Sequence, residues 1–196
     1  MAFKINLPNS DIRYYEKFLN EKFSEKLYKY LLEYNNWEKK EIIIFGKKCK
    51  QNRKTCVFSY PGLNYRYSGT DNIGEDMNKH PILIEVKNKI EKLFDDKYQF
   101  NYILGNKYED GTENIGMHSD DERDLLGPIA SISIGSERNF DFKHKYDKTI
   151  KKRLNLKNGS LVIMNNPTQK FYKHGVPIQK KIKDCRINLT YRVVKK

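Results

Sequence analysis

The sequence predicts an α+β domain with a β-sandwich or jelly-roll core. Two segments with helical periodicity come first, and short segments with strand periodicity fill the second half of the chain. No Pro- or Ser-rich linker divides the 196 residues, a length that fits a single domain. The order of elements therefore indicates helices packed against a mostly antiparallel β core.

Two helices are expected in the first half of the chain. Residues 20–34 carry apolar side chains at helical spacing behind Asn20, a residue type that caps helix N-termini. These side chains are Phe23, Leu27, Leu31 and Tyr34. Residues 81–94 repeat the pattern and begin with Pro81, which is favourable in a first helical turn.

Elsewhere the hydrophobic period falls to two, which is typical of strands. The segments with this pattern are 41–45, 100–104, 129–134, 139–142, 160–164 and 186–194. The Asn158-Gly159 pair is a strong turn signal, and it predicts a hairpin that joins residues 153–156 to 160–164.

Composition limits the classes of function. The chain has 38 Lys and Arg against 25 Asp and Glu, a net charge of +13, and 13% of its residues are aromatic. This combination favours a polyanionic partner, with nucleic acid first, because lysines follow phosphates and aromatic rings stack on bases. The alternative is that many Lys, Asn, Ile and Tyr residues reflect a nucleotide-biased genome. The aromatic content argues against a disordered chain.

No segment has the length and apolar character of a membrane span, so no membrane association is expected. The N-terminal segment lacks the apolar core of a signal peptide, and the three cysteines form no CxxC pair. We therefore expect an intracellular protein without a disulfide framework or a zinc knuckle.

A candidate metal site lies at His118 and Asp120. Side chains two residues apart on an extended segment share a face, and His174 follows 54 residues after Asp120. Two histidines and one aspartate form the facial triad of non-haem Fe(II) oxygenases. An HxD pair is also common by chance in surface loops. The other two histidines, His80 and His144, have no carboxylate at ligand spacing and are expected at the surface or facing phosphate.

The segment 186–192 alternates four polar residues on one face of a strand. They are Arg186, Asn188, Thr190 and Arg192. Guanidinium groups bind carboxylates through two parallel hydrogen bonds, so this face suits a dicarboxylate such as 2-oxoglutarate. The alternative is a ladder of salt bridges at a sheet edge.

Together these motifs resemble the AlkB family of Fe(II)/2-oxoglutarate dioxygenases, most closely its eukaryotic duplex-DNA repair branch. The resemblance covers residues 41–194 and rests on blocks such as NKYEDGTENIGMHSDDERDL, PIASISIG and RINLTYR. It implies a double-stranded β-helix, which is a jelly roll, with N-terminal helices and a nucleotide-recognition finger region. It also implies one domain, 1–196, with a recognition part over 1–95 and a catalytic core over 96–196.

The resemblance assigns roles to individual residues. Fe(II) would be bound by His118, Asp120 and His174. The co-substrate 2-oxoglutarate would be held by Asn106, Tyr108, Arg186, Asn188, Thr190 and Arg192, with Arg192 on its distal carboxylate. A flipped base would lie between Tyr65, Arg66 and Tyr67, beside an acidic lip of Asp121 and Glu122. DNA would be contacted by a finger, Phe45, Gly46 and Lys47, and by a basic loop, Lys180 and Lys181.

The implied reaction is oxidative demethylation of 1-methyladenine and 3-methylcytosine in DNA, with Fe(II), 2-oxoglutarate and O2. Two alternatives remain at this point: an RNA demethylase of the same family, and a catalytically silent nucleic-acid-binding module. The resemblance also implies a monomer that prefers duplex DNA, in the nucleus if the source is eukaryotic and otherwise in the cytoplasm. Met117, Ser119 and Gly105 depart from the family pattern and leave the substrate preference open.

Overall fold

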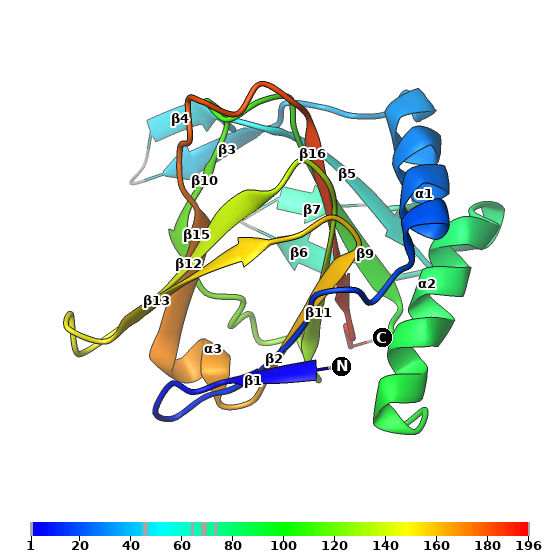
Figure 1. The fold of residues 1–196 in the computed structure, drawn as a ribbon. Coiled ribbons are helices and arrows are strands. Elements are labelled where there is room, and N and C mark those ends of the chain that lie inside the picture. The colour runs from blue at the N-terminus through cyan, green and yellow to red at the C-terminus, as the bar shows by residue number, and fades with distance from the viewer. Residues whose placement is uncertain (1, 45–46, 64, 68–69, 73, 196) are drawn as a thin grey trace.

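The structure, a computed structural model, describes residues 2–44, 47–63, 65–67, 70–72 and 74–195. Its core is a pair of facing β-sheets (Figure 1). The large sheet contains β1 (Ala2–Ile5), β2 (Asp11–Tyr15), β5 (Lys54–Ser59), β8 (Glu75–Asp76), β9 (Tyr102–Tyr108), β11 (Ile129–Gly135), β14 (Ser160–Asn165) and β16 (Arg186–Arg192). The small sheet contains β10 (Ile115–His118), β12 (Arg138–His144), β13 (Lys151–Leu156) and β15 (Tyr172–Val176).

The chain crosses repeatedly from one sheet to the other. The large sheet has the order β1-β2-β14-β11-β16-β9-β5-β8, and the small sheet has the order β10-β15-β12-β13. From β9 to β16 the strands alternate between the large sheet and the small sheet, except that the consecutive strands β12 and β13 both lie in the small sheet. This alternation is that of a jelly roll, so the predicted fold class is confirmed.

The two predicted helices are present and cover the outer face of the large sheet. They are α1 (Glu21–Glu33) and α2 (Pro81–Glu91), which lie side by side in Figure 1. The Asn20 side chain caps α1 by accepting a 2.8 Å hydrogen bond from the Phe23 amide. Their apolar stripes share one buried cluster with residues of the large sheet. The helices contribute Leu27, Leu31, Val86 and Ile90, and the strands contribute Ile132, Ile187 and Leu189. A third helix, α3 (Thr168–Phe171), is one short turn, and 3-10 turns cover Met77–Lys79 and Lys92–Phe94.

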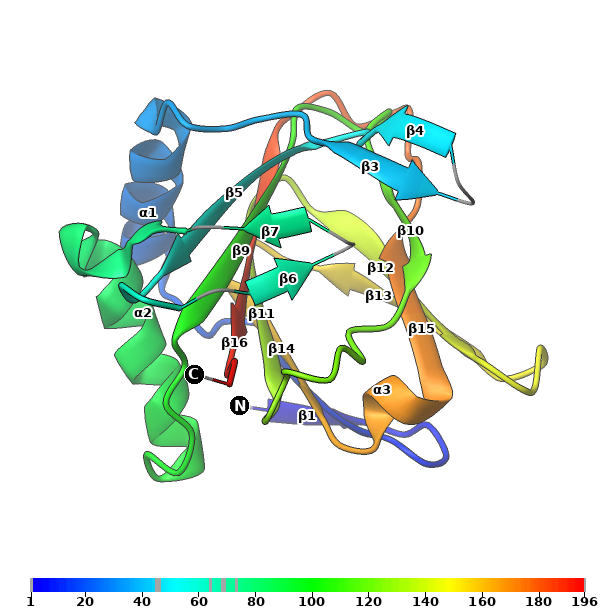
Figure 2. The same cartoon turned by 180° about the vertical axis from the view of Figure 1, so that it is seen from behind.

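Two small hairpins lie over one end of the sandwich. One consists of β3 (Glu41–Ile44) and β4 (Lys47–Lys50), and the other of β6 (Tyr65–Tyr67) and β7 (Thr70–Asn72). Figure 2 shows both on the same side of the molecule. Within the described part of the chain, no helix is long and apolar enough to cross a membrane.

The predicted hairpin at Asn158-Gly159 is wrong, although the turn itself exists. Gly159 adopts the left-handed backbone conformation with φ +73°, as the sequence signal requires. However, β13 pairs with β12 in the small sheet, whereas β14 pairs with β11 and β2 in the large sheet. The turn therefore carries the chain between sheets, because its local geometry does not decide which neighbours the two strands pair with.

His80 is also not where the sequence predicted it. Its side chain is buried, its Nε2 lies 3.2 Å from Glu75 Oε1, and its Nδ1 contacts the Tyr30 hydroxyl. It therefore joins α1 to the segment before α2. His144 is half-buried on β12, where its Nδ1 accepts from the backbone of the following turn.

Four strands that precede residue 95, namely β1, β2, β5 and β8, belong to the same large sheet as strands from the second half of the chain. β2 pairs with β14, and β5 pairs with β9. Strands from the expected recognition part thus extend the large sheet at both edges. The large sheet therefore continues across residue 95, the expected boundary between the recognition part and the catalytic core.

Candidate active site

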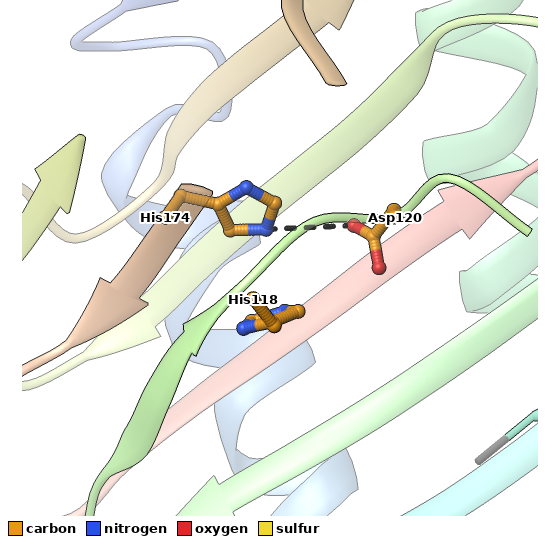
Figure 3. Close-up of side chains that lie close together, drawn as sticks. All are labelled: His118, Asp120 and His174. Carbon is orange, nitrogen blue, oxygen red and sulfur yellow. Dashed lines mark ion pairs between the residues drawn. The ribbon is translucent and has the colours of Figure 1, made fainter. Parts of the chain in front are cut away.

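Three ligand-bearing side chains converge between the sheets. His118 ends β10 and lies directly opposite His174 of β15 in the strand register. Asp120 follows two residues later, and Figure 3 shows its carboxylate beside both imidazoles. One ligand atom from each residue lies within 4.8 Å of the others, and His174 Nε2 is 3.5 Å from Asp120 Oδ2. The predicted triad is therefore assembled in space.

The protonation states of the triad suit a divalent metal ion. Burial lowers the pKa of His118 to about 4, with a further contribution from His174. Burial alone would raise the pKa of Asp120, but the Arg192 guanidinium and His174 outweigh it and hold this pKa below its usual range. A neutral imidazole and an ionised carboxylate are the forms that bind metal.

The inward face of the large sheet forms the opposite wall of the same cavity. The cavity is lined by Leu104, Asn106, Tyr108, Ile115, His118, Asp120, Ser131, Phe140, Met164, His174, Val176, Arg186, Asn188, Thr190 and Arg192. The predicted 2-oxoglutarate residues are all in this set. They come together because alternate residues of β9 and β16 face inward, while Ile187, Leu189 and Tyr191 face the helices.

The two amide side chains in this wall bond to each other and to neighbouring polar side chains. Asn106 Nδ2 donates to Asn188 Oδ1 at 3.1 Å, and Asn106 Oδ1 accepts from Arg53 Nε at 2.6 Å. Asn188 Nδ2 donates to Ser131 Oγ at 2.8 Å, and Thr190 donates to Asn188 Oδ1 at 3.1 Å. This network fixes the shape of the wall.

Arg186 and Arg192 have different surroundings. Arg192 was expected to bind the distal carboxylate of the co-substrate, but its Nη2 lies 2.6 Å from Asp120 Oδ1, in the metal site. Arg186 lies against the Tyr108 ring, with 5.3 Å from Cζ to the ring centroid, and donates one hydrogen bond to Ser133. Its buried Nε and Nη1 have no hydrogen-bond partner in the described structure, and burial lowers its pKa to about 10.

A second cleft adjoins the triad and contains the expected acidic lip. Asp120, Asp121 and Glu122 line this cleft together with Lys145. Asp121 is exposed and forms a 3.0 Å ion pair with Lys145. Glu122 is half-buried, and burial raises the pKa of its carboxyl group. Both acids therefore lie beside the metal site.

Part of the expected base pocket and finger cannot be compared with the structure. Phe45 and Gly46 lie outside the described residues. Lys47 begins β4, and Tyr65, Arg66 and Tyr67 form β6, but their side chains are also outside the described part. Their roles remain predictions.

The expected basic loop, Lys180 and Lys181, is an exposed turn. It is held from below by Gly111, whose amide donates to Ile182 O at 2.9 Å and whose carbonyl accepts from the Gln179 amide at 2.7 Å. A Cβ atom at Gly111 would lie 1.9 Å from Gln179 O, so only glycine fits there. Both lysines are therefore exposed to solvent on a turn that hydrogen bonds to Gly111 hold in place.

The structure explains two of the three departures from the family pattern. A Cβ atom at Gly105 would lie 2.6 Å from Cys56 Sγ and 2.9 Å from the Trp37 ring, so packing outside the cavity requires glycine. Ser119 donates a 2.8 Å hydrogen bond to Tyr172 O. Nothing in the structure explains Met117.

Several residues of the site were missed by the sequence analysis. Ser131 and Ser133 alternate along the predicted strand 129–134, so the signal was present. Arg53 and Gln169 come from distant segments, and no local pattern marks them. Gln169 accepts a 3.0 Å hydrogen bond from the Asp120 amide.

Comparison with known proteins agrees with this geometry. The 2OG-Fe(II) oxygenase superfamily profile matches residues 11–192. The chain is 36% identical over 163 residues to the DNA oxidative demethylase ALKBH2 of Mus musculus, covering 79% of this chain and 66% of that protein. It is 34% identical over 211 residues to the ALKBH2 of Arabidopsis thaliana, covering 94% and 67%. The chain spans about two thirds of the length of each of these two relatives.

More distant relatives agree. The alpha-ketoglutarate-dependent dioxygenase alkB homolog 3 of Homo sapiens is 33% identical over 145 residues, covering 69% of this chain and 50% of that protein. The solved structure of OsALKBH1 superposes with a TM-score of 0.63 at 16% identity, covering 96% of this chain and 100% of that one, and so supports the fold alone. Fe(II), 2-oxoglutarate and O2 are the cofactor and co-substrates of this class, and the triad and its protonation states fit such a metal. The chain belongs to the 2OG-Fe(II) oxygenase superfamily and, within it, to the AlkB family.

Proposed function

We propose that this protein is a DNA oxidative demethylase that acts on 1-methyladenine and 3-methylcytosine. The observation that carries the proposal is the single cavity in which His118, Asp120 and His174 face the buried guanidinium of Arg186. The relatives named DNA oxidative demethylase support the choice of substrate. An intact triad argues against the silent binding module.

The chain itself binds and orients the reactants. The triad would hold Fe(II), and Arg186 would hold the distal carboxylate of 2-oxoglutarate, because its free nitrogens need an anionic partner. Bound Fe(II) with 2-oxoglutarate and O2 supplies the oxidising chemistry that hydroxylates an N-methyl group, with succinate and CO2 as by-products. The hydroxymethyl group then leaves the base as formaldehyde.

The acidic lip would favour the damaged base over a normal one. 1-Methyladenine and 3-methylcytosine carry a positive charge, and Asp121 and Glu122 lie next to the metal ligand Asp120. A carboxylate within a few ångströms of a cation stabilises it, more so in a partly buried cleft. The lip therefore supports a cationic methylated substrate.

The distribution of charge supports a nucleic-acid substrate. A groove along β12 and β13 is lined by Asp141, Phe142, Lys143, His144, Lys148, Lys151, Lys152 and Arg153. Asp141 neutralises Arg153 through an ion pair, with 2.6 Å between Asp141 Oδ1 and Arg153 Nε. The lysines of the groove would then bind backbone phosphates. Together with the net charge of +13, this groove suits a DNA backbone. Such a substrate also supports the expected intracellular location, in the nucleus of a eukaryote.

The direct test is turnover of methylated oligonucleotides. The protein, Fe(II) and 2-oxoglutarate are mixed anaerobically with DNA or RNA strands that carry 1-methyladenine or 3-methylcytosine, single-stranded and duplex. After addition of O2, mass spectrometry should show loss of the methyl group from DNA, with formaldehyde in equal amount. Faster demethylation of the RNA strands would favour the RNA alternative, and no demethylation of any strand would refute the proposal.

A further inference from the structure

Asp120 is the metal ligand with the least backbone support. His118 and His174 are held by strand pairing between β10 and β15. Asp120 instead lies in residues 119–122, which have no regular secondary structure. Its position must therefore be set by other contacts.

One of these contacts is a buried hydrogen bond from α3. The Asp120 amide donates to Gln169 Oε1 at 3.0 Å, and the Gln169 side chain is buried. Gln169 is itself fixed, because neighbouring Thr168 accepts a 3.1 Å bond from the Asp11 amide of β2. The bond therefore connects the ligand-bearing loop, through α3, to strand β2 of the large sheet.

A second contact lies one residue earlier. Ser119 Oγ donates to the Tyr172 carbonyl at 2.8 Å, at the start of β15. The Tyr172 ring is buried, and its hydroxyl donates to Pro8 O at 2.7 Å. Two bonds, one from the Ser119 hydroxyl to β15 and one from the Asp120 amide to α3, thus hold the loop at Asp120.

We propose that Gln169 is a positioning residue for the metal site and that it acts through Asp120, with Ser119 as a secondary support. Without the Gln169 acceptor, the buried Asp120 amide loses its partner, and the loop gains freedom to move the carboxylate away from the two imidazoles. Groups that orient metal ligands typically affect metal affinity by tenfold to a hundredfold. The inference rests on the metal site alone and not on the identity of the substrate.

The test measures Mn(II) binding to the metal-free protein by electron paramagnetic resonance. Gln169→Met keeps the length of the side chain but removes the acceptor, and it should weaken Mn(II) binding about tenfold to a hundredfold. Gln169→Glu keeps the acceptor and should stay within about threefold of the unchanged protein. Asn165→Ala is the matched control: it removes a 2.9 Å bond to the Asp11 carboxylate near α3 but keeps the bond from the Asp11 amide to Thr168, and it should leave the affinity unchanged.

Three results would overturn the proposal. They are unchanged Mn(II) affinity in Gln169→Met, equal weakening in Gln169→Met and Gln169→Glu, and equal weakening in the Asn165→Ala control. If Gln169→Met fails to fold, Ser119→Ala tests the same loop and should weaken Mn(II) binding about threefold to tenfold. Unchanged affinity in a folded Ser119→Ala protein would then overturn the proposal.

Discussion

Arg192 and Asp120 form a buried ion pair inside the metal site. Arg192 Nη2 lies 2.6 Å from Asp120 Oδ1, and each side chain is only 2% exposed. Arg186, on the same face of β16, has no acidic partner of this kind among the described residues. The two arginines should therefore respond in opposite ways to removal of their charge.

Arg192→Met should destabilise the metal-free protein by about 3 to 5 kcal/mol, because it leaves the Asp120 carboxylate buried and uncompensated. Arg186→Met should lower the free energy of unfolding far less, or raise it, since it removes a buried charge that has no acidic partner among the described residues. Urea unfolding of both variants at pH 7 measures the difference. Equal losses of stability would contradict the distinction.

Arg186→Met should raise the KM for 2-oxoglutarate at least tenfold. Loss of a charge-assisted pair in a closed cavity costs about 2 kcal/mol or more. Mn(II) affinity in the same variant should stay within about twofold, because Arg186 does not contact the triad. An unchanged KM would place the distal carboxylate elsewhere in the cavity.

His118→Ala, Asp120→Ala and His174→Ala should each abolish formaldehyde release while the protein remains folded. Each variant removes one of three ligands, and the remaining two hold the metal poorly. Asp124→Ala removes a nearby exposed carboxylate and serves as the control. Substantial turnover by any ligand variant would refute the assignment of that residue.

The metal-free protein should lose stability as the pH falls from 7 to 4. His118 has a pKa of about 4 when folded, against an ordinary value near 6.5, so between these values the unfolded chain binds a proton that the folded protein does not. The contribution is fully present above about pH 6.5, and about 3 kcal/mol is lost by pH 4. The low pKa of Asp120 adds a loss only below about pH 4. His118→Gln should flatten the profile in chemical denaturation between pH 7 and 4.

Much of the site was predictable because its signals are local. The alternation of residues 186–192 placed Arg186, Asn188, Thr190 and Arg192 on one face, and the structure has them on one wall of the cavity. Their individual roles were not predictable in this way. Arg192 contacts Asp120 because its end of β16 lies beside the loop that follows β10. This neighbourhood depends on the order of the strands in the sheets, which the alternation within one strand does not reveal.

Other features had no sequence signal at all. Gln169 reaches Asp120 across 49 residues, and His80 is buried because α1 packs beside it. Strand β2, DIRYY, has two charged residues among its first three, and only its pairing with β14 makes it part of the large sheet. In each case the missing information is a contact between distant segments.

Phe45→Ala should reduce demethylation of duplex DNA more than that of single strands, by about tenfold in the ratio. This expectation comes from the sequence: an apolar residue followed by Gly46 and Lys47 suits a wedge that fills the gap left by a flipped base. A tenfold ratio corresponds to about 1.4 kcal/mol of lost wedge stabilisation. Because the ratio compares two substrates on one variant, a general loss of stability cancels. Equal slowing of both substrates would make Phe45 a packing residue.

The N-terminal strands cover an apolar strand of the large sheet. β2 occupies the edge of β14 that β11 leaves open, and β14 contains four consecutive apolar residues, 161–164. A chain beginning after Tyr15 would present that apolar strand with unpaired backbone groups, which is a template for pairing with other copies. Residues 2–15 therefore move the open edge of the large sheet from the buried, apolar β14 to the short and mostly exposed β1.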